Sequence, residues 1–149
     1  MEPQEPNSAT SPAIRPAQFA DLDQVFAVAL EFATSFRPEK EVFASNFCRL
    51  IEPHDALTLV AEQSGQIKGY LLGFDHDTFF ANGRVAWIEE LMVRKEQRRN
   101  GIGTQLVEHF ERWATSRGNI LVALATRRAA PFYAAIGYEE SATYYRKLL

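Results

Sequence analysis

The spacing of apolar residues predicts a strand and two helices in the first third of the chain. Ile14–Pro16 has the character of a short edge strand, because a proline is tolerated at the edge of a sheet. Apolar side chains then recur at helical intervals over residues 22–30 and again from about Pro38 to Ile51. Pro53 cannot continue a helix, so the second helix ends before it.

The remainder of the chain alternates strand-like and helix-like patterns. Leu57–Glu62 and Ile67–Phe74 flank a polar turn and predict a hairpin. A continuous apolar run such as Ile120–Ala125 is typical of a strand buried on both faces. The other expected elements are a strand at Arg84–Val93, a helix from Gly103 to Gly118, a short helix at about Ala129–Ile136 and a last strand at Ala142–Leu148. The resulting order βααβββαβαβ predicts a mixed α/β domain.

Composition limits the class of protein. The 149 residues are 46% hydrophobic and 23% charged, as expected of one soluble globular domain. Residues 1–12 contain three prolines among polar residues, so we expect a disordered tail there and one domain over residues 13–149. No apolar run reaches the roughly 18–20 residues of a membrane span, and the N-terminus lacks the pattern of a secretory signal. Cys48 is the single cysteine, which excludes an internal disulfide and favours a cytoplasmic location.

Positive charge is concentrated in one short segment. The net charge of the chain is −3, which argues against nonspecific binding to nucleic acid. The segment Arg94–Arg99 nevertheless contains four cations and one anion. A compact basic segment in an acidic chain suggests one localised anionic ligand.

The basic segment leads into a helix that begins at a pair of glycines. The first turn of a helix presents unpaired backbone N–H groups and the positive end of the helix dipole. Gly101 and Gly103 have no Cβ atom, so a ligand can approach the backbone, and Arg98 and Arg99 add charged donors. These features predict a pyrophosphate site. The P-loop pattern is absent, and the dinucleotide pattern fails because Leu106 occupies its third glycine position.

Two motifs in this region resemble those of a known family. The first is Glu89-Glu90-Leu91-Met92-Val93 followed by Arg98-x-x-Gly101-x-Gly103, and the second is Pro131-Phe132-Tyr133-x-x-x-Gly137-Tyr138. Their order and content are similar to the GNAT superfamily of acyl-CoA-dependent N-acetyltransferases, over about Ile14 to Leu148. The resemblance implies a single domain with a central mixed, mostly antiparallel twisted sheet flanked by about four helices.

The resemblance also implies how acetyl-CoA would be held. Backbone groups of Leu91, Met92 and Val93 would pair with the pantetheine arm, where the fourth strand of the family separates from the fifth. Thr126 replaces an asparagine that is common in the family, so a contact from that side chain is less secure. The pyrophosphate would lie on the helix start and its loop, at Arg98, Arg99, Asn100, Gly101, Ile102, Gly103 and Thr104.

Three residues are candidates for proton transfer. A phenol close to the thioester can protonate the thiolate leaving group, and the family commonly uses the tyrosine that corresponds to Tyr133. A carboxylate can remove the proton of the attacking amine. Glu89 and Glu90 occupy an otherwise apolar strand, and strict alternation would direct them to opposite faces. We favour Glu89 as the base, with Glu90 as a close second.

The sequence therefore predicts an N-acetyltransferase that moves an acetyl group from acetyl-CoA to a primary amine by direct attack in a ternary complex. The acceptor is a small-molecule or peptide amine, and the adjacent acids favour a cationic one. The net charge and the short apolar runs speak against nucleic acid and membrane as partners, and no metal is expected because the three histidines are scattered. The resemblance is compatible with a homodimer. The alternative is a catalytically idle acyl-CoA-binding regulatory module on the same fold.

Overall fold

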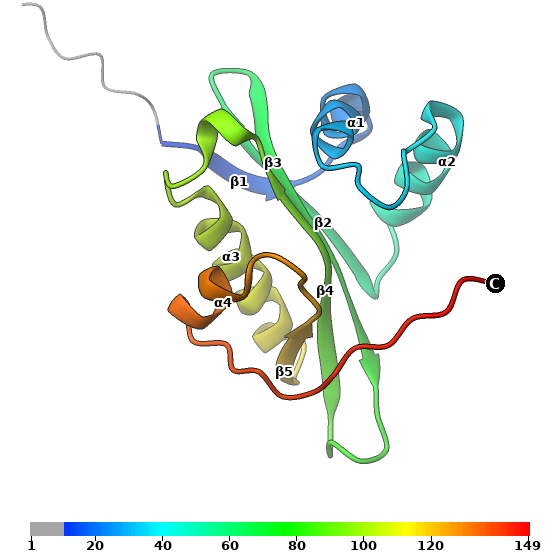
Figure 1. Ribbon diagram of the computed structural model, residues 1–149, viewed down its shortest axis with the longest axis vertical. Helices are drawn as coiled ribbons and strands as arrows, with labels where there is room; N and C mark the ends of the chain where they lie inside the picture. The colour runs from blue at the N-terminus through cyan, green and yellow to red at the C-terminus, as the bar shows by residue number, and fades with distance from the viewer. Residues whose placement is uncertain (1–10) are drawn as a thin grey trace, which may run out of the picture.

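A computed structural model describes residues 11–149 as an α/β domain built on one five-stranded sheet (Figure 1). The strands follow each other across the sheet in the order β1-β2-β3-β4-β5; the first four are antiparallel neighbours, and β5 runs parallel to β4. The elements are β1 (Ala13–Pro16), α1 (Leu22–Glu31), α2 (Lys40–Leu50), β2 (Ala56–Gln63), β3 (Gln66–Asp77), β4 (Arg84–Val93), α3 (Ile102–Ser116), β5 (Asn119–Leu124) and α4 (Ala130–Ala135).

The predicted element order is confirmed up to the last helix, and the last strand is wrong. Residues 138–149 form neither strand nor helix, and every residue of 139–149 is exposed. The description of Ile120–Ala125 as buried on both faces is also wrong, since Ile120 and Leu121 in β5 are 54% and 46% exposed. Within the described chain β5 is an edge strand, so no neighbour covers its outer side. The disordered tail predicted over residues 1–12 lies outside the described residues, apart from its last two.

Two apolar cores lie on opposite faces of the sheet. The core beneath α3 contains Leu106, Val107 and Phe110, which are fully buried against β2, β3 and β4. These residues recur at helical spacing, so one face of α3 is apolar and packs onto the sheet. The other core joins α1 and α2 to the sheet through residues such as Val28, Phe47 and Tyr70. The sheet is therefore the middle layer between two helix layers.

A β-bulge interrupts β4 at the two adjacent acids. Leu72 of β3 lies opposite Glu90, whereas the next residue of β3, Gly73, lies opposite Ile88, so Glu89 is the extra residue. Ile88 and Leu91 both pack on the α3 side, although an unbroken strand would place residues three apart on opposite faces. The bulge thus reverses the alternation of side chains in the second half of β4.

A buried carboxylate ties the far ends of β3, β4 and β5 together. The side chain of Asp75 accepts hydrogen bonds from Arg84 at 2.8 Å, from Arg117 at 2.7 Å and from Asn119 at 2.9 Å. Burial alone would raise the pKa of Asp75, but these hydrogen bonds outweigh it and hold the pKa well below its ordinary value. The network fixes the start of β5 next to β4.

We expect Asp75→Asn to lower the free energy of unfolding by about 3 kcal/mol, because it leaves two arginines near the interior without their shared anion. Asp77→Asn is the matched control, since Asp77 pairs with the same Arg84 at 3.0 Å but its side chain is 86% exposed. Its effect should stay within about 1 kcal/mol. Urea unfolding measures both. The Asp75 contribution should be full at neutral pH, decline as the pH falls below about 4, the ordinary pKa of the carboxyl, and be lost only as the pH falls through the lowered pKa of the folded state.

Candidate functional site

β4 and β5 separate beside the bulge and leave half of β4 with an open edge. The last paired residues are Ile88 and Leu124, where β5 ends. Beyond this point β4 continues through Leu91 to Val93 and pairs only with β3 on its other side. The peptide groups on the side of β4 away from β3 have no strand beside them here. They are therefore available to an extended ligand, as the resemblance implied for residues 91–93.

The N-terminus of α3 lies at the end of this open edge. A methyl group on Gly103 would stand 3.8 Å from the side chain of Val93, the last residue of β4. The first intrahelical hydrogen bond runs from the Gln105 N–H to the Gly101 carbonyl, at 3.0 Å. The N–H groups of the three residues between them accordingly have no partner within the helix. The first turn contains no acidic residue, so its positive dipole end is not neutralised.

Glycine occupies the two positions at this helix start for different structural reasons. Gly101 has φ +77°, a left-handed conformation that favours glycine, and a Cβ there would meet only the end of the Gln105 side chain, at 3.9 Å. A Cβ on Gly103 would instead approach the ring of Phe132 to 3.3 Å. The absence of a side chain at Gly103 therefore allows α4 to pack closely on α3, while Gly101 leaves its backbone accessible.

The basic segment is only partly directed at the helix start. Arg94 donates to Glu31 at 2.8 Å and to the Ile67 carbonyl at 3.0 Å, so it ties α1 to the sheet. The guanidinium of Arg98 lies 4.8 Å from the centre of the Phe32 ring. Arg99 is exposed, with a left-handed φ of +69°. Asn100 and Arg99 immediately precede Gly101 and remain the polar side chains nearest to it in sequence.

Tyr133 lies on the α3 side of the sheet, between two aromatic rings. It is 9% exposed and packs edge-on against Phe132 and Tyr138, with ring centres 4.9 and 5.7 Å away. No hydrogen bond joins its hydroxyl to another residue of the described chain. Burial raises the pKa of Tyr133, so the phenol keeps its proton at neutral pH.

The two acids of β4 lie together on the opposite face. The Tyr70 hydroxyl, in the core beneath α1, donates to Glu90 Oε1 at 2.9 Å. Trp87 Nε1 donates to Glu89 Oε2 at 3.0 Å from two residues earlier in the same strand. The expectation that these acids face opposite ways is therefore wrong, because the bulge places their side chains on one face.

The environments of the two acids differ. Glu89 is exposed, whereas Glu90 is partly buried beside the fully packed Tyr70. Burial raises the pKa of Glu90; the hydrogen bond from Tyr70 opposes that effect, and the negative charge of Glu89 reinforces it. A carboxyl with a raised pKa is a stronger proton acceptor once ionised. The surroundings of Glu90 therefore suit it to proton removal better than those of Glu89.

Tyr70 was not identified from the sequence as part of the site. The only indication in the sequence is that Tyr70 lies in the predicted hairpin. In the sheet, Tyr70 lies opposite Met92, two residues from Glu90. Thr126 also has a specific role, because its hydroxyl accepts the Ala129 N–H at 3.0 Å. That bond holds the loop that leads into α4.

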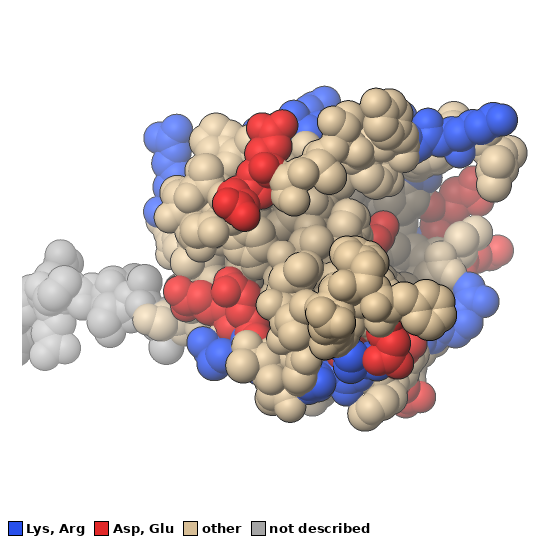
Figure 2. All heavy atoms as spheres, turned by 90° about the horizontal axis from the view of Figure 1, so that it is seen from below, with Lys and Arg blue, Asp and Glu red and all other residues tan. Residues whose placement is uncertain are grey.

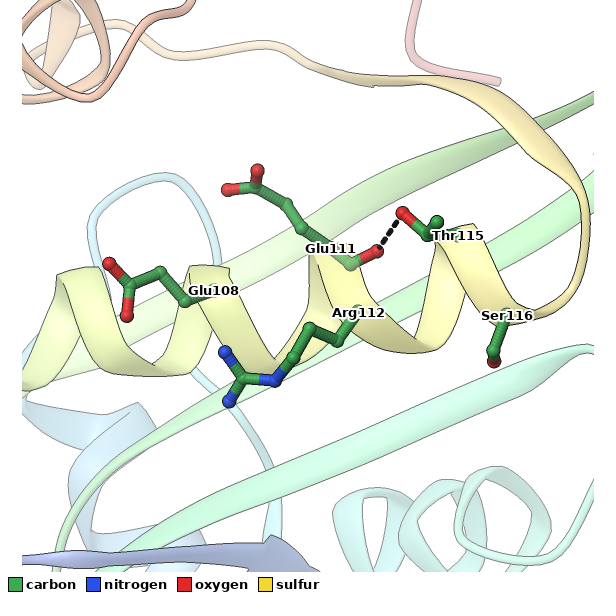
Figure 3. A pocket seen from close by; sticks show the side chains of 5 residues that line it. All are labelled: Glu108, Glu111, Arg112, Thr115 and Ser116. Carbon is green, nitrogen blue, oxygen red and sulfur yellow. Dashed lines mark hydrogen bonds between the residues drawn. The ribbon is translucent and has the colours of Figure 1, made fainter.

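Other surface features lie apart from this site. A shallow hollow runs along α3 and is lined by Glu108, Glu111, Arg112, Thr115 and Ser116 (Figure 3). Glu111 and Arg112 point away from each other there, and none of the candidate site residues lines it. Among residues 11–149 no group of three or more His, Cys, Asp or Glu side chains is placed to hold a metal. None of the helices in this part of the chain could cross a membrane.

Solved structures with the same fold include three that are informative. A protein described as a transcriptional regulator from Bacillus halodurans C-125 matches with 25% identity and a TM-score of 0.83, covering 93% of this chain and 99% of the other. Glucosamine-6-phosphate N-acetyltransferase from Arabidopsis thaliana matches with 20% identity and a TM-score of 0.82, over 93% and 98%. An aminoglycoside N-acetyltransferase in complex with CoA matches with 18% identity and a TM-score of 0.82, over 96% and 98%.

The sequence itself also matches a family model. No curated protein sequence matches the chain significantly. The model of the acetyltransferase (GNAT) family matches residues 22–138, which include the bulge of β4, the start of α3 and Tyr133. With the open edge of β4 next to an unneutralised helix start, this match establishes that the chain belongs to the acetyltransferase (GNAT) family.

Proposed function

We propose that this protein transfers the acetyl group of acetyl-CoA to a primary amine, by direct attack of the amine while both substrates are bound. The observation that carries the proposal is the separation of β4 from β5 at Ile88, with the N-terminus of α3 at its end. This arrangement offers peptide groups to an extended arm and unpaired N–H groups to a diphosphate.

The backbone supplies most of the proposed contacts to acetyl-CoA. Peptide groups of Leu91, Met92 and Val93 would bind the pantetheine arm along the open edge. The diphosphate would lie on the N–H groups of Ile102, Gly103 and Thr104, with Arg99 and Asn100 beside it. We expect Arg98 to contribute little to diphosphate binding, because its guanidinium lies over the Phe32 ring.

We expect Gly101→Val to weaken acetyl-CoA binding severely, by about 10-fold or more, because the added side chain would occupy the space beside the helix start, which only the end of the Gln105 side chain borders now. The left-handed φ also makes the substitution costly, by about 1–2 kcal/mol. Gly118→Val is the matched control: Gly118 follows the other end of α3, has φ +80°, and a Cβ there would face open space. Both variants should lose similar stability in thermal unfolding.

Isothermal titration with acetyl-CoA distinguishes the two variants. Binding should be weakened severely in the Gly101 variant and unchanged in the Gly118 variant. Equal affinity in both would mean that the diphosphate binds elsewhere.

Two proton transfers accompany the proposed reaction. As the amine nitrogen bonds to the acetyl carbon, the carbon–sulfur bond breaks and its electrons go to sulfur. Tyr133 would give its proton to that thiolate, since its buried phenol is protonated at neutral pH. The proton that leaves the amine would pass to a carboxylate of β4, directly or through water.

We assign the role of base to Glu90. It is held at 2.9 Å by the buried Tyr70, and its pKa is raised by burial. Glu89, on the same face and exposed, would attract a positively charged acceptor. Two adjacent carboxylates on one face favour a cationic small molecule or a basic peptide end as the acceptor.

A thiol-release assay with acetyl-CoA and a panel of amines tests the proposal. Polyamines, amino sugars and peptides with basic N-termini should release CoA faster than neutral amines of the same size. The idle-module alternative predicts acetyl-CoA binding in the titration without thiol release from any amine. That result would refute the enzymatic proposal and leave the binding site intact.

A further inference from the structure

Two aromatic residues of the sheet belong to neither core. Trp87 of β4 and Phe74 of β3 lie directly opposite each other, so their side chains share one face. Ile88, the next residue of β4, packs in the core beneath α3, so Trp87 points to the other face, where α1 and α2 lie. The core on that face reaches only to Tyr70 of β3 and Met92 of β4. Trp87 and Phe74 therefore lie beyond it, and both are half-buried.

These two residues are part of a larger apolar surface, at the end of the sheet next to the β3–β4 loop. Strand pairing places further apolar residues of β3, β4 and β5 on the same face, and none of them belongs to either core. The residues of this apolar surface are Leu72, Phe74, Val85, Trp87, Leu121 and Ala123. This end of the molecule faces the viewer in Figure 2, which shows a broad uncharged area there with acidic groups beside it. Apolar side chains outside a core form a surface that a ligand can bury.

The apolar surface begins at the two acids of the candidate site. Leu72 lies opposite Glu90. Trp87 Nε1 donates to Glu89 Oε2 at 3.0 Å, so the edge of the indole ring lies at the carboxylate. Negative charge and apolar area are therefore continuous on one face of the sheet. A molecule that complements both has a positive charge at one end and an apolar group beside it.

We propose that the acceptor is a primary amine with an alkyl or aryl group, which lies against Trp87 and Phe74 while the nitrogen lies at Glu89 and Glu90. This inference rests on the proposed function and specifies the class of its acceptor. Trp87 is then a specificity-determining residue: its ring supports the apolar group, and its N–H orients the carboxylate of Glu89. Hydroxyl and ether oxygens on this surface would lose hydrogen bonds to water without gaining others, so hydrophilic amines bind less well.

Two amines of equal charge and size test this specificity. Hexylamine and aminoethoxyethanol each have one amino group and the same number of non-hydrogen atoms, but only hexylamine has an apolar chain. The kcat/KM for thiol release from acetyl-CoA should be higher with hexylamine by about 10-fold or more. The ether amine is the less basic of the two and has more of its neutral form, so basicity cannot produce this result. Equal kcat/KM values would overturn the inference.

Variants of Trp87 separate the role of its ring from that of its N–H. Trp87→Ala should abolish the preference for hexylamine, mainly by raising its KM, because the ring contributes to binding and not to the chemical step. Trp87→Phe should keep the preference, because it retains a ring and removes only the N–H that Glu89 accepts. Phe19→Ala is the matched control, since Phe19 is 54% exposed and follows β1 at the opposite edge of the sheet. A preference that survives Trp87→Ala, or that the Phe19 variant loses equally, would contradict the assignment.

Tryptophan fluorescence tests the same contact without turnover. The chain contains two tryptophans, Trp87 and Trp113. Trp113→Phe leaves Trp87 as the single emitter and keeps an aromatic ring against Phe110. With CoA in place of acetyl-CoA, hexylamine should shift the Trp87 emission to shorter wavelength, because the alkyl chain displaces water from the ring. Aminoethoxyethanol at the same concentration should cause no shift.

The outcomes separate this inference from the proposed function. A shift with hexylamine but no thiol release from any amine would refute acetyl transfer and still support the apolar surface as a binding site. Thiol release without any shift would overturn the inference and leave the proposed function intact. A shift to longer wavelength on removal of residues 139–149, with no response to either amine, would mean that the C-terminal segment covers the surface, and this result too would overturn the inference.

Discussion

Tyr133→Phe should lower kcat by about 10²–10⁴-fold, the loss typical of a missing general acid, while acetyl-CoA affinity changes little. The variant keeps the ring and its edge-on contacts with Phe132 and Tyr138 and removes only a hydroxyl that no described residue binds. Without that proton donor the thiolate must leave unprotonated. Steady-state thiol release with the best acceptor, together with titration calorimetry, measures the two quantities.

Tyr138→Phe is a matched control for this experiment. Tyr138 packs against Tyr133 in the same core, and its buried hydroxyl has no hydrogen-bond partner in the described chain. Removing it should leave kcat within about 2-fold and should not destabilise the fold, because an unpaired buried hydroxyl costs free energy. Turnover of the Tyr133 variant at the wild-type rate would show that its phenol has only a packing role.

Glu90→Gln should lower kcat by about 10²–10⁴-fold and remove the acidic limb of the kcat–pH profile, because the amide cannot accept the proton of the amine. Glu89→Gln should keep most of the activity and move that limb to lower pH. The negative charge of Glu89 raises the pKa of Glu90, so its removal allows Glu90 to ionise at lower pH.

Tyr70→Phe should move the same limb in the opposite direction. The hydrogen bond from Tyr70 favours the ionised form of Glu90, so its loss raises the pKa and the limb moves to higher pH. A residue with a purely structural role would change stability without moving this limb. If the Glu89 variant loses the limb and the Glu90 variant keeps it, Glu89 is the base and the assignment above is wrong.

The match between sequence and structure is closest where local spacing decides the outcome. The strand predicted at Arg84–Val93 has the bounds of β4, and the helix predicted over residues 22–30 differs from α1 by one residue. Apolar spacing and turn residues act within a few positions, so they are readable along the chain. The glycine at the start of α3 is of the same kind, because a left-handed φ at Gly101 is a local requirement.

The site depends on features that act between strands. Strict alternation along the strand predicts that the side chains of Glu89 and Glu90 lie on opposite faces. The register of β4 against β3 instead contains a bulge, which places both acids on one face. The same register puts Tyr70 within hydrogen-bond distance of Glu90. A bulge arises from the fit of two strands to each other, so neither strand alone encodes its position.

By itself, the sequence determined the elements up to the last helix, the family and the residues around which acetyl-CoA is expected to bind, because motif and periodicity are properties of short segments. The tertiary structure decided which acid is buried, which tyrosine holds it, and that β5 and residues 139–149 are both exposed. Burial and pairing depend on what lies across a strand in space. An apolar run such as Ile120–Ala125 signals that a neighbour is needed, but only the assembled fold reveals that the chain's own residues 11–149 do not supply it.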